Sequence, residues 1–174
     1  MIDIVLSDKK RLQEFGRGLG YSKTLHYKIF NIKFGSNRSF FESKKTEIIT
    51  NLENHEKKDY LNQKNSGLDQ VLCKLAKKNK IAIAFNLPLI LKNQPEILGR
   101  IKQNIKLCRK YKIPMVLVSF AKDYLDMRNP TDLISLGISL GMTQKEAKEA
   151  VSINIEEILE RKNKNIITEG IEII

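Results

Sequence analysis

The stretch SGLDQVLCKLAKKNKIAIAFNL, residues 66–87, contains the two patterns that decide the fold. In its first half, apolar residues recur at helical spacing between Leu68 and Ala76, with lysines on the opposite side. Ser66 and Asp69 have the spacing of a capping box, so the pattern predicts a helix over residues 68–79. In its second half, residues 81–87 are apolar almost throughout, which is typical of a strand buried on both faces of a sheet.

The same order of elements follows once more along the chain. Residues 96–111 have a second helical stripe of apolar side chains, and residues 115–120, MVLVSF, form a second apolar strand. Strands of this kind joined by helices are parallel, because a parallel pair needs a long crossover connection. The sequence therefore predicts an α/β fold, with a parallel sheet and outer helices, in a single domain over residues 1–174.

The two ends of the chain give weaker signals. In the first 65 residues, three segments are candidate strands: 2–6, 27–34 and 47–52. The polar segment that follows them is predicted to be a loop or a short helix. In the last third, helix caps are predicted at Asn129 (with Pro130 and Asp132), at Gly141, at the Thr143–Glu146 pair and at Asn154. The tail IITEGIEII, residues 166–174, is either a final strand or a loose end.

The net charge of +11, with a pI of about 9.6, indicates what the protein binds and says little about its fold. Residues 67–112 have 11 Lys/Arg against 2 Asp/Glu, whereas residues 1–66 have a net charge of +5 and residues 113–174 one of −3. Such an excess favours a polyanionic partner: RNA, DNA or an anionic membrane surface. A lysine-rich solvated surface is the alternative, but it would usually bring glutamates with it.

Few residues are suited to hold a metal. Cys73 and Cys108 fall on the apolar sides of predicted helices, which favours buried free thiols in a reducing cytosol over a structural zinc site. The histidines are His26 and His55, and we expect His55 to be solvated in its polar segment. No apolar run approaches the roughly 18 residues of a membrane-spanning helix. We therefore expect a cytoplasmic protein that binds no metal and has no membrane partner.

The loop after the second apolar strand has the best-formed set of polar residues: Ser119, Lys122, Asp123, Asp126 and Arg128. Loops at the carboxyl ends of parallel strands are where α/β proteins place their sites. A helix-entry loop with solvated charges and a cap explains the same residues equally well.

Two stretches together resemble a known family. They are SGLDQVLCKLAKKNKIAIAFNL and NIKLCRKYKIPMVLVSFAKDYLDMRNPTDLISLGISLGMTQKEAKEAVSINIEEILERKN, which are similar to archaeal ribonuclease P protein component 3, a relative of the thirty-kilodalton subunit of nuclear ribonuclease P and ribonuclease MRP. The resemblance covers roughly residues 64–163 and keeps the order of all its pieces. Phe120 departs from it, because the family commonly has glycine at that position.

The resemblance implies a fold, a function and partners. The fold would be a TIM-barrel-like parallel sheet with outer helices, shortened or incomplete here. The function would be that of a non-catalytic RNA-binding subunit that supports the catalytic RNA of ribonuclease P in 5′ maturation of precursor tRNA. The protein itself would bind no cofactor, and Mg²⁺ would be bound by the RNA. The partners would be ribonuclease P RNA, precursor tRNA indirectly, and ribonuclease P protein component 2, in a heterotetramer.

These implications lead to a predicted set of site residues. The two basic helices would present cations to RNA phosphates, with Arg128 oriented by Asp132 four residues later, and the acidic C-terminal third would contact protein. The predicted RNA-binding residues are Lys74, Lys77, Arg109, Lys110, Lys122 and Arg128, and no residue is predicted to be catalytic. The alternative function is a metal-dependent phosphoesterase of the related barrel superfamily, which would need several convergent His and Asp/Glu ligands.

Overall fold

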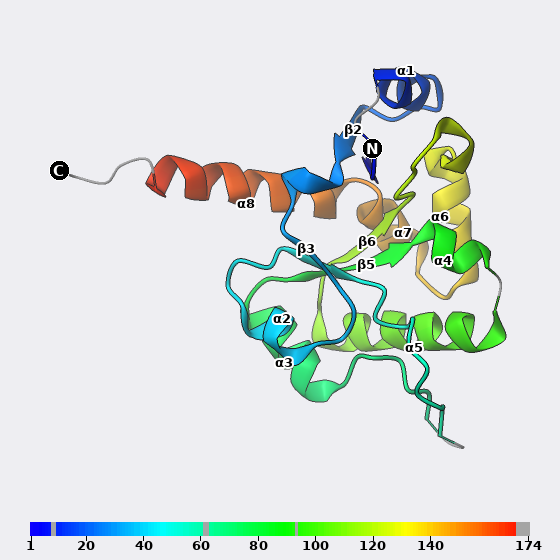
Figure 1. Ribbon diagram of the computed structural model, residues 1–174, viewed down its shortest axis with the longest axis vertical. Helices are drawn as coiled ribbons and strands as arrows, with labels where there is room; N and C mark the ends of the chain where they lie inside the picture. Colours follow the sequence, from blue (N-terminus) through cyan, green and yellow to red (C-terminus); the bar gives the residue numbers. More distant parts are fainter. Residues whose placement is uncertain (8–9, 61–62, 93, 170–174) are drawn as a thin grey trace.

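Short parallel strands form the centre of the molecule (Figure 1). The protein is described from a computed structural model, which places residues 1–7, 10–60, 63–92 and 94–169. Within these ranges there are six strands: β1 (Ile2–Val5), β2 (Lys23–His26), β3 (Ile32–Phe34), β4 (Ile48–Thr50), β5 (Ala82–Asn86) and β6 (Met115–Val118). β1 pairs with β2, and β3, β4, β5 and β6 form a second sheet in that order, with every pair parallel. The predicted α/β fold with a parallel sheet is confirmed.

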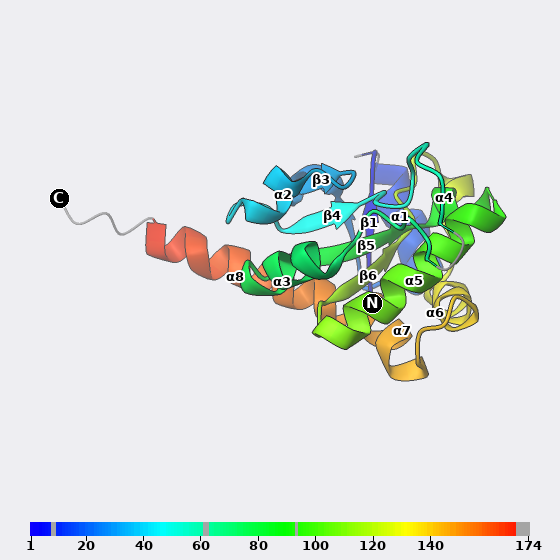
Figure 2. The ribbon, with the colours of Figure 1, turned by 90° about the horizontal axis from the view of Figure 1, so that it is seen from below.

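Helices connect and cover the strands. They are α1 (Lys10–Gly18), α2 (Arg38–Glu42), α3 (Gln70–Lys78), α4 (Leu87–Leu91), α5 (Pro95–Tyr111), α6 (Pro130–Ser139), α7 (Gln144–Ala150) and α8 (Ile153–Glu169), with 3₁₀ turns η1 (Tyr27–Ile29) and η2 (Tyr124–Asp126). α3 and α5 lie side by side along one flank of β5 and β6 (Figure 2). Both predicted basic helices are therefore present, next to each other.

Successive side chains of each strand point to opposite faces of the sheet, so the core consists of two clusters. Ile83 and Phe85 of β5 pack with the helices on one face of the sheet. Ala82 and Ala84, which point the other way, pack with β1 and with Ile155 and Ile158 of α8. Both faces of β5 are thus buried, which is why the strand is apolar from Ala82 to Phe85.

β1 is fastened to the end of β6 by a buried carboxylate. Asp3 accepts hydrogen bonds from the Ser119 backbone N–H at 2.8 Å and from Ser119 Oγ at 2.6 Å. The Phe120 N–H also donates to the Ile4 carbonyl oxygen at 2.9 Å. Burial raises the pKa of Asp3 to about 6, although its hydrogen bonds oppose this shift. β1 therefore stands beside β6 and joins the two sheets.

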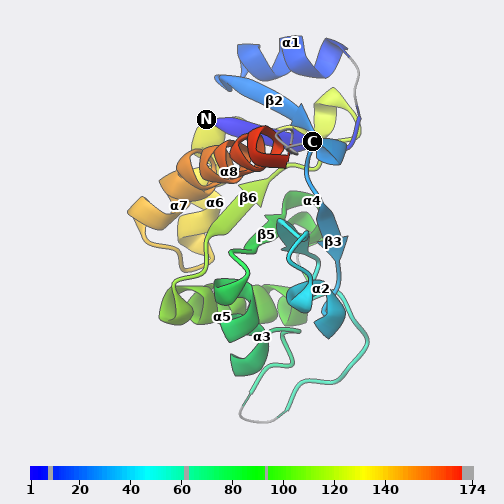
Figure 3. The same cartoon turned by 90° about the vertical axis from the view of Figure 1, so that its left-hand side faces the viewer.

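α8 crosses the amino ends of the strands and then extends beyond them (Figures 1 and 3). Asn154 donates to the carbonyl oxygen of Met115, which begins β6, at 2.8 Å. Further along, Arg161 donates to the carbonyl oxygen of Lys80 at 2.8 Å, and Lys162 lies 3.8 Å from the Glu47 carboxylate. The predicted N-cap role of Asn154 is wrong, since this residue is inside α8 and binds the sheet. Residues 166–169 continue the helix and form no strand, and residues 170–174 lie outside the described residues.

Other caps are partly as predicted. The Asn129 cap, the Gly141 stop with φ of 105°, and the Thr143–Glu146 capping box are confirmed. The N-cap of α3 is Asp69, which accepts from the Leu72 N–H at 2.8 Å. The prediction of Ser66 as that cap is wrong, because Ser66 is buried against α5.

Segment 27–34 is also not one strand, since η1 separates β2 from β3. Helix α1 was not predicted.

Phe120 has a backbone conformation that a glycine would adopt more freely. Its φ is +44°, in the left-handed region that costs an ordinary residue about 1–2 kcal/mol. Its side chain is buried, and its ring centroid lies 6.4 Å from that of Phe34. Burial of the ring offsets the backbone strain of this turn after β6.

Candidate nucleic-acid interface

The longest irregular connection that the structure describes is the segment between β4 and α3. Its residues 53–66 are called the 53–66 loop. Its described residues form no helix or strand, and Lys57, Lys58 and Lys64 are exposed along it. Long irregular segments are uncommon in compact domains and are often functional. How this loop is held therefore matters for what it presents.

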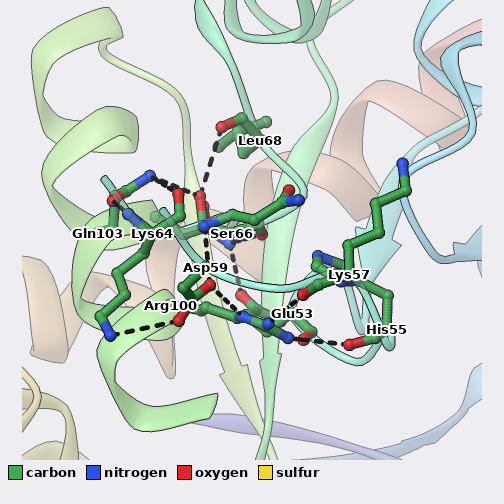
Figure 4. A network of polar contacts seen from close by, with 11 residues as sticks. Glu53, His55, Lys57, Asp59, Lys64, Ser66, Leu68, Arg100 and Gln103 are labelled. Carbon is green, nitrogen blue, oxygen red and sulfur yellow. Dashed lines mark hydrogen bonds and ion pairs between the residues drawn. The ribbon is translucent and has the colours of Figure 1, made fainter. Parts of the chain in front are cut away.

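Arg100 of α5 holds the first half of the loop (Figure 4). Its guanidinium donates to the carbonyl oxygens of Glu53, His55 and Lys57 at 3.1, 2.9 and 2.6 Å, and to Asp59 Oδ1 at 2.9 Å. The arginine side chain is only 6% exposed. Burial alone would raise the pKa of Asp59, but hydrogen bonds from Arg100, Asn65 and Lys64 hold it below its usual range. The carboxylate is therefore ionised and paired.

Gln103 and Asn104, one turn further along α5, hold the second half. Gln103 exchanges hydrogen bonds with the Lys64 backbone at 2.8 and 3.1 Å, and also donates to Ser66 Oγ. Asn104 donates to Glu53 Oε1 at 2.7 Å and to the Ser66 carbonyl oxygen at 2.9 Å, which ties together the two ends of the loop. Positions 100, 103 and 104 share one side of the helix. A rigid helix thus fixes the loop backbone at several points.

Glu53 is a buried carboxyl group within this network. It is 2% exposed, and burial raises its pKa to about 7, against the opposing effect of the Asn104 hydrogen bond. The protonation state of Glu53 therefore changes near neutral pH.

The structure separates the predicted RNA-binding residues into two regions. Lys74 and Lys77 are exposed on α3, and Lys110 is exposed at the end of α5, next to the amino ends of β5 and β6. Lys122 and Arg128 follow β6, and so lie at the carboxyl ends of the strands. The predicted residues therefore do not form one continuous site.

The Arg109 side chain is bound by other residues of this protein. Its guanidinium forms two hydrogen bonds with the Glu146 carboxylate, at 2.7 and 2.6 Å, and one with the Gly141 carbonyl oxygen at 2.7 Å. The pKa of Glu146 falls to about 2, first because of the hydrogen bond from Arg109. Glu146 also closes the capping box of α7. Arg109 thus links α5 to α7, a pairing that no pattern in the sequence predicts.

We expect Arg109→Ala to lower the free energy of unfolding by about 1 kcal/mol, as for a partly exposed ion pair. The salt dependence of RNA binding should stay at the wild-type value. The loss of stability should shrink as the pH falls below about 4.5 and disappear below about 2, because the folded-state pKa of Glu146 is depressed to about 2 and its contribution is lost on protonation. Urea denaturation at pH 7 and pH 2 measures the first effect, and a salt titration measures the second. If the variant instead shows a reduced slope of log K against log salt and an unchanged stability, the predicted contact of Arg109 with RNA would be supported.

The predicted pairing of Arg128 with Asp132 is wrong. The Arg128 guanidinium turns back onto the carbonyl oxygens of Leu125 and Met127, at 2.8 Å each, and no ion pair joins it to Asp132. The backbone N–H of Asp132 is bound by the Asn129 cap. Arg128 therefore supports the turn around η2, although its side chain stays exposed.

Two further sequence expectations need correction. On charge alone Arg100 would be expected among the outward-facing cations of α5, but it is buried under the 53–66 loop. His55 was expected to be solvated, yet both ring nitrogens are shielded from solvent without a hydrogen-bond partner, and burial lowers its pKa. The free thiols of Cys73 and Cys108 are buried, as predicted.

Among the described residues, no three His, Cys, Asp or Glu side chains are placed to hold a metal ion. No helix in the described ranges is long and apolar enough to cross a membrane.

The sequence matches the family model described as RNase P subunit p30 over residues 2–166, nearly the whole chain. The chain belongs to the RNase P subunit p30 family. Its relatives include Ribonuclease P protein component 3 of Methanosarcina acetivorans, at 33% identity over 144 residues, and that of Methanococcus vannielii, at 31% over 144 residues. These alignments cover 79% of this chain but only 57% and 59% of the two relatives. This member of the p30 family thus spans less than two thirds of their length.

A solved structure has the same fold as this p30-family chain. It is a chain in a cryo-EM structure of archaeal Ribonuclease P with mature tRNA, with a TM-score of 0.66 and 19% sequence identity. The match covers 94% of this chain and 81% of that chain. The likeness therefore extends through the N-terminal strands, where the sequence patterns are weakest.

Proposed function

We propose that this protein is a non-catalytic RNA-binding subunit of ribonuclease P, which supports the catalytic RNA in 5′ maturation of precursor tRNA. The observation that carries the proposal is the p30-family match over residues 2–166, together with relatives named Ribonuclease P protein component 3. In this proposal Mg²⁺ is bound by the RNA, and the protein acts in the cytoplasm without a cofactor of its own.

The charge distribution supports an RNA partner. The basic segment 67–112 forms α3 and α5, which lie next to each other and expose lysines along their length. Folded RNA is bound largely through its phosphates and its shape. Lys74, Lys77 and Lys110 are placed for such contacts, and Lys122 and Arg128 could form a second, smaller contact.

We further propose that the two sheets are sectors of one TIM-barrel-like arrangement. Chain order and spatial order agree within each sheet, and β1 is hydrogen-bonded to the end of β6. The described strands show no pairing between β2 and β3, so the ring would be interrupted there. The small side chains of Ala82 and Ala84 suit the narrow interior that such a ring would enclose.

The acidic C-terminal third is the proposed protein-binding region. Residues 113–174 have a net charge of −3, which makes them a poor RNA surface. Ile138 and Ile153 are exposed there, and α8 extends past the strands (Figure 1). Ribonuclease P protein component 2 is the proposed partner, in a heterotetramer.

Reconstitution of precursor tRNA cleavage tests the function. Ribonuclease P RNA and the remaining protein subunits of the same organism should cleave faster when this protein is added. The variant with Lys74, Lys77 and Lys110 changed to alanine should stimulate cleavage less, because up to three phosphate contacts are lost. The matched control changes Lys23, Lys28 and Lys148, which are exposed elsewhere. Cleavage that does not respond to the wild-type protein would refute the proposed function.

A further inference from the structure

Lys64 is fixed against the outer face of α5 at a helical glycine. A Cβ atom at Gly99 would lie 3.3 Å from Lys64 Cε and 3.8 Å from its Cδ. The glycine therefore leaves room for the stem of the lysine. A glycine inside a helix lowers the stability of the helix by about 0.5–1 kcal/mol relative to alanine. At position 99 this loss of helix stability comes with a closer contact between α5 and the loop. Lys64 Nζ is held 3.2 Å from Asp59 Oδ2, and Asp59 is itself held by Arg100 (Figure 4).

Three other lysines lie on the same outer face of α5. Lys102, Lys106 and Lys110 are all exposed and follow at intervals of four residues, about 6 Å apart along the helix. The buried residues Ile101, Asn104, Ile105 and Cys108 occupy the opposite side. At about 100° per residue, Gly99 lies within the outward arc that these lysines occupy. Lys64 therefore stands at one end of a row that the helix continues.

We propose that Lys64, Lys102, Lys106 and Lys110, the α5 lysine row, bind consecutive phosphates of a folded RNA, and that the Arg100-held loop places Lys64 in the row. This inference rests on the proposed RNA-binding function and names the surface that performs it. It adds three lysines to the predicted contacts, of which one comes from a different segment of the chain.

The surroundings of the row suit a polyanion. Lys102, Lys106 and Lys110 form no ion pair with any described residue. The Asp59 carboxylate is shared between Arg100 and Lys64, and that of Glu146 is paired with Arg109, which leaves Glu96 in the first turn of α5 as the exposed acid of the helix.

The outer face of α5 itself exposes little apolar surface. No residue of α5 has an exposed large hydrophobic side chain, whereas Leu91 of α4, beside Lys102, and Tyr60 of the 53–66 loop are exposed. A protein interface usually has an apolar or aromatic centre, whereas phosphate binding requires only placed cations.

The test measures the affinity of this protein for ribonuclease P RNA of the same organism across a salt series. Each phosphate contact contributes about 0.7–0.9 to the slope of log K against log salt. Changing all four row lysines to alanine should reduce the slope by about 3, and Lys64→Ala alone by about 1. The charge-matched control changes Lys23, Lys28, Lys145 and Lys148 to alanine, and should keep the wild-type slope.

Gly99→Leu tests the placement of Lys64 without changing charge. The larger side chain should displace the lysine stem and reduce the slope as much as Lys64→Ala does, while circular dichroism shows a folded protein. A wild-type slope for Gly99→Leu or for the four-lysine variant would overturn the inference. A wild-type protein that is folded but does not bind the RNA would instead overturn the proposed function.

Discussion

Arg100→Met should lower the free energy of unfolding by about 3–5 kcal/mol, the typical cost of removing one partner of a buried ion pair. Methionine fills much of the arginine volume but donates no hydrogen bond. The substitution would leave three loop carbonyl oxygens without their donor, and would leave Asp59 without its main cation. Urea denaturation at pH 7 measures the change.

Lys102→Met provides the matched control on the same helix. Lys102 is exposed and forms no ion pair with a described residue, so its loss should change stability by less than about 0.5 kcal/mol. An Arg100→Met variant as stable as the control would show that the 53–66 loop does not depend on the guanidinium. The placement of Lys64 would then rest on Gln103 and Gly99 alone, and the part that the inference gives to Arg100 would be lost.

Arg100 shows where sequence patterns stop being informative. It lies about one helical position away from the apolar stripe of α5, and charge alone assigns it to solvent. Its burial depends on a loop that is separated from it by about 40 residues and has no periodicity of its own. The spacing of Arg100, Gln103 and Asn104 was visible, but nothing in the sequence identified their partners.

Regular elements with local signals were predicted well. β5 and β6 are buried on both faces and read as apolar runs, and α5, α6 and α7 have clear stripes or caps. The cap predictions at Asn154 and Ser66 are wrong because Asn and Ser near a helix start are typical N-caps. In this fold both residues bind buried groups elsewhere. Local chemistry cannot distinguish a cap from such a tertiary contact.

The N-terminal strands were hard to place for a different reason. β3 and β4 have three residues each, which is too short for a period-two pattern to stand out. α1 contains two glycines, which weaken the helical signal. The pairing of these elements with the rest of the sheet decides their structure.

Protonation of Glu53 and Asp3 should increase the free energy of unfolding as the pH falls from 8 to 5, against a smaller opposing contribution from His55, whose pKa is lowered by burial. The pKa of Glu53 rises from its usual 4.5 to about 7, and that of Asp3 from 3.8 to about 6, in both cases mainly because of burial. A carboxyl group whose folded-state pKa is raised binds more protons in the folded state, so protonation stabilises the fold. This contribution grows as the pH falls through the folded-state pKa and is complete below the unfolded one. For Glu53 it amounts to about 3 kcal/mol.

Glu53→Gln should remove the Glu53 part of this pH dependence. Glutamine keeps an oxygen that can accept from Asn104 Nδ2, and it buries no charge. Its amide also supplies a hydrogen-bond donor, which could satisfy the Oδ1 atom of the neighbouring Asn104 that is buried without a hydrogen bond. The variant should therefore be more stable than the wild type by about 2–3 kcal/mol at pH 8 and about equal to it at pH 5. Glu56→Gln, an exposed change in the same loop, should keep the wild-type profile. Parallel profiles for wild type and Glu53→Gln between pH 5 and 8 would mean that Glu53 does not titrate in this range, and that water reaches the carboxyl group despite its position under the loop.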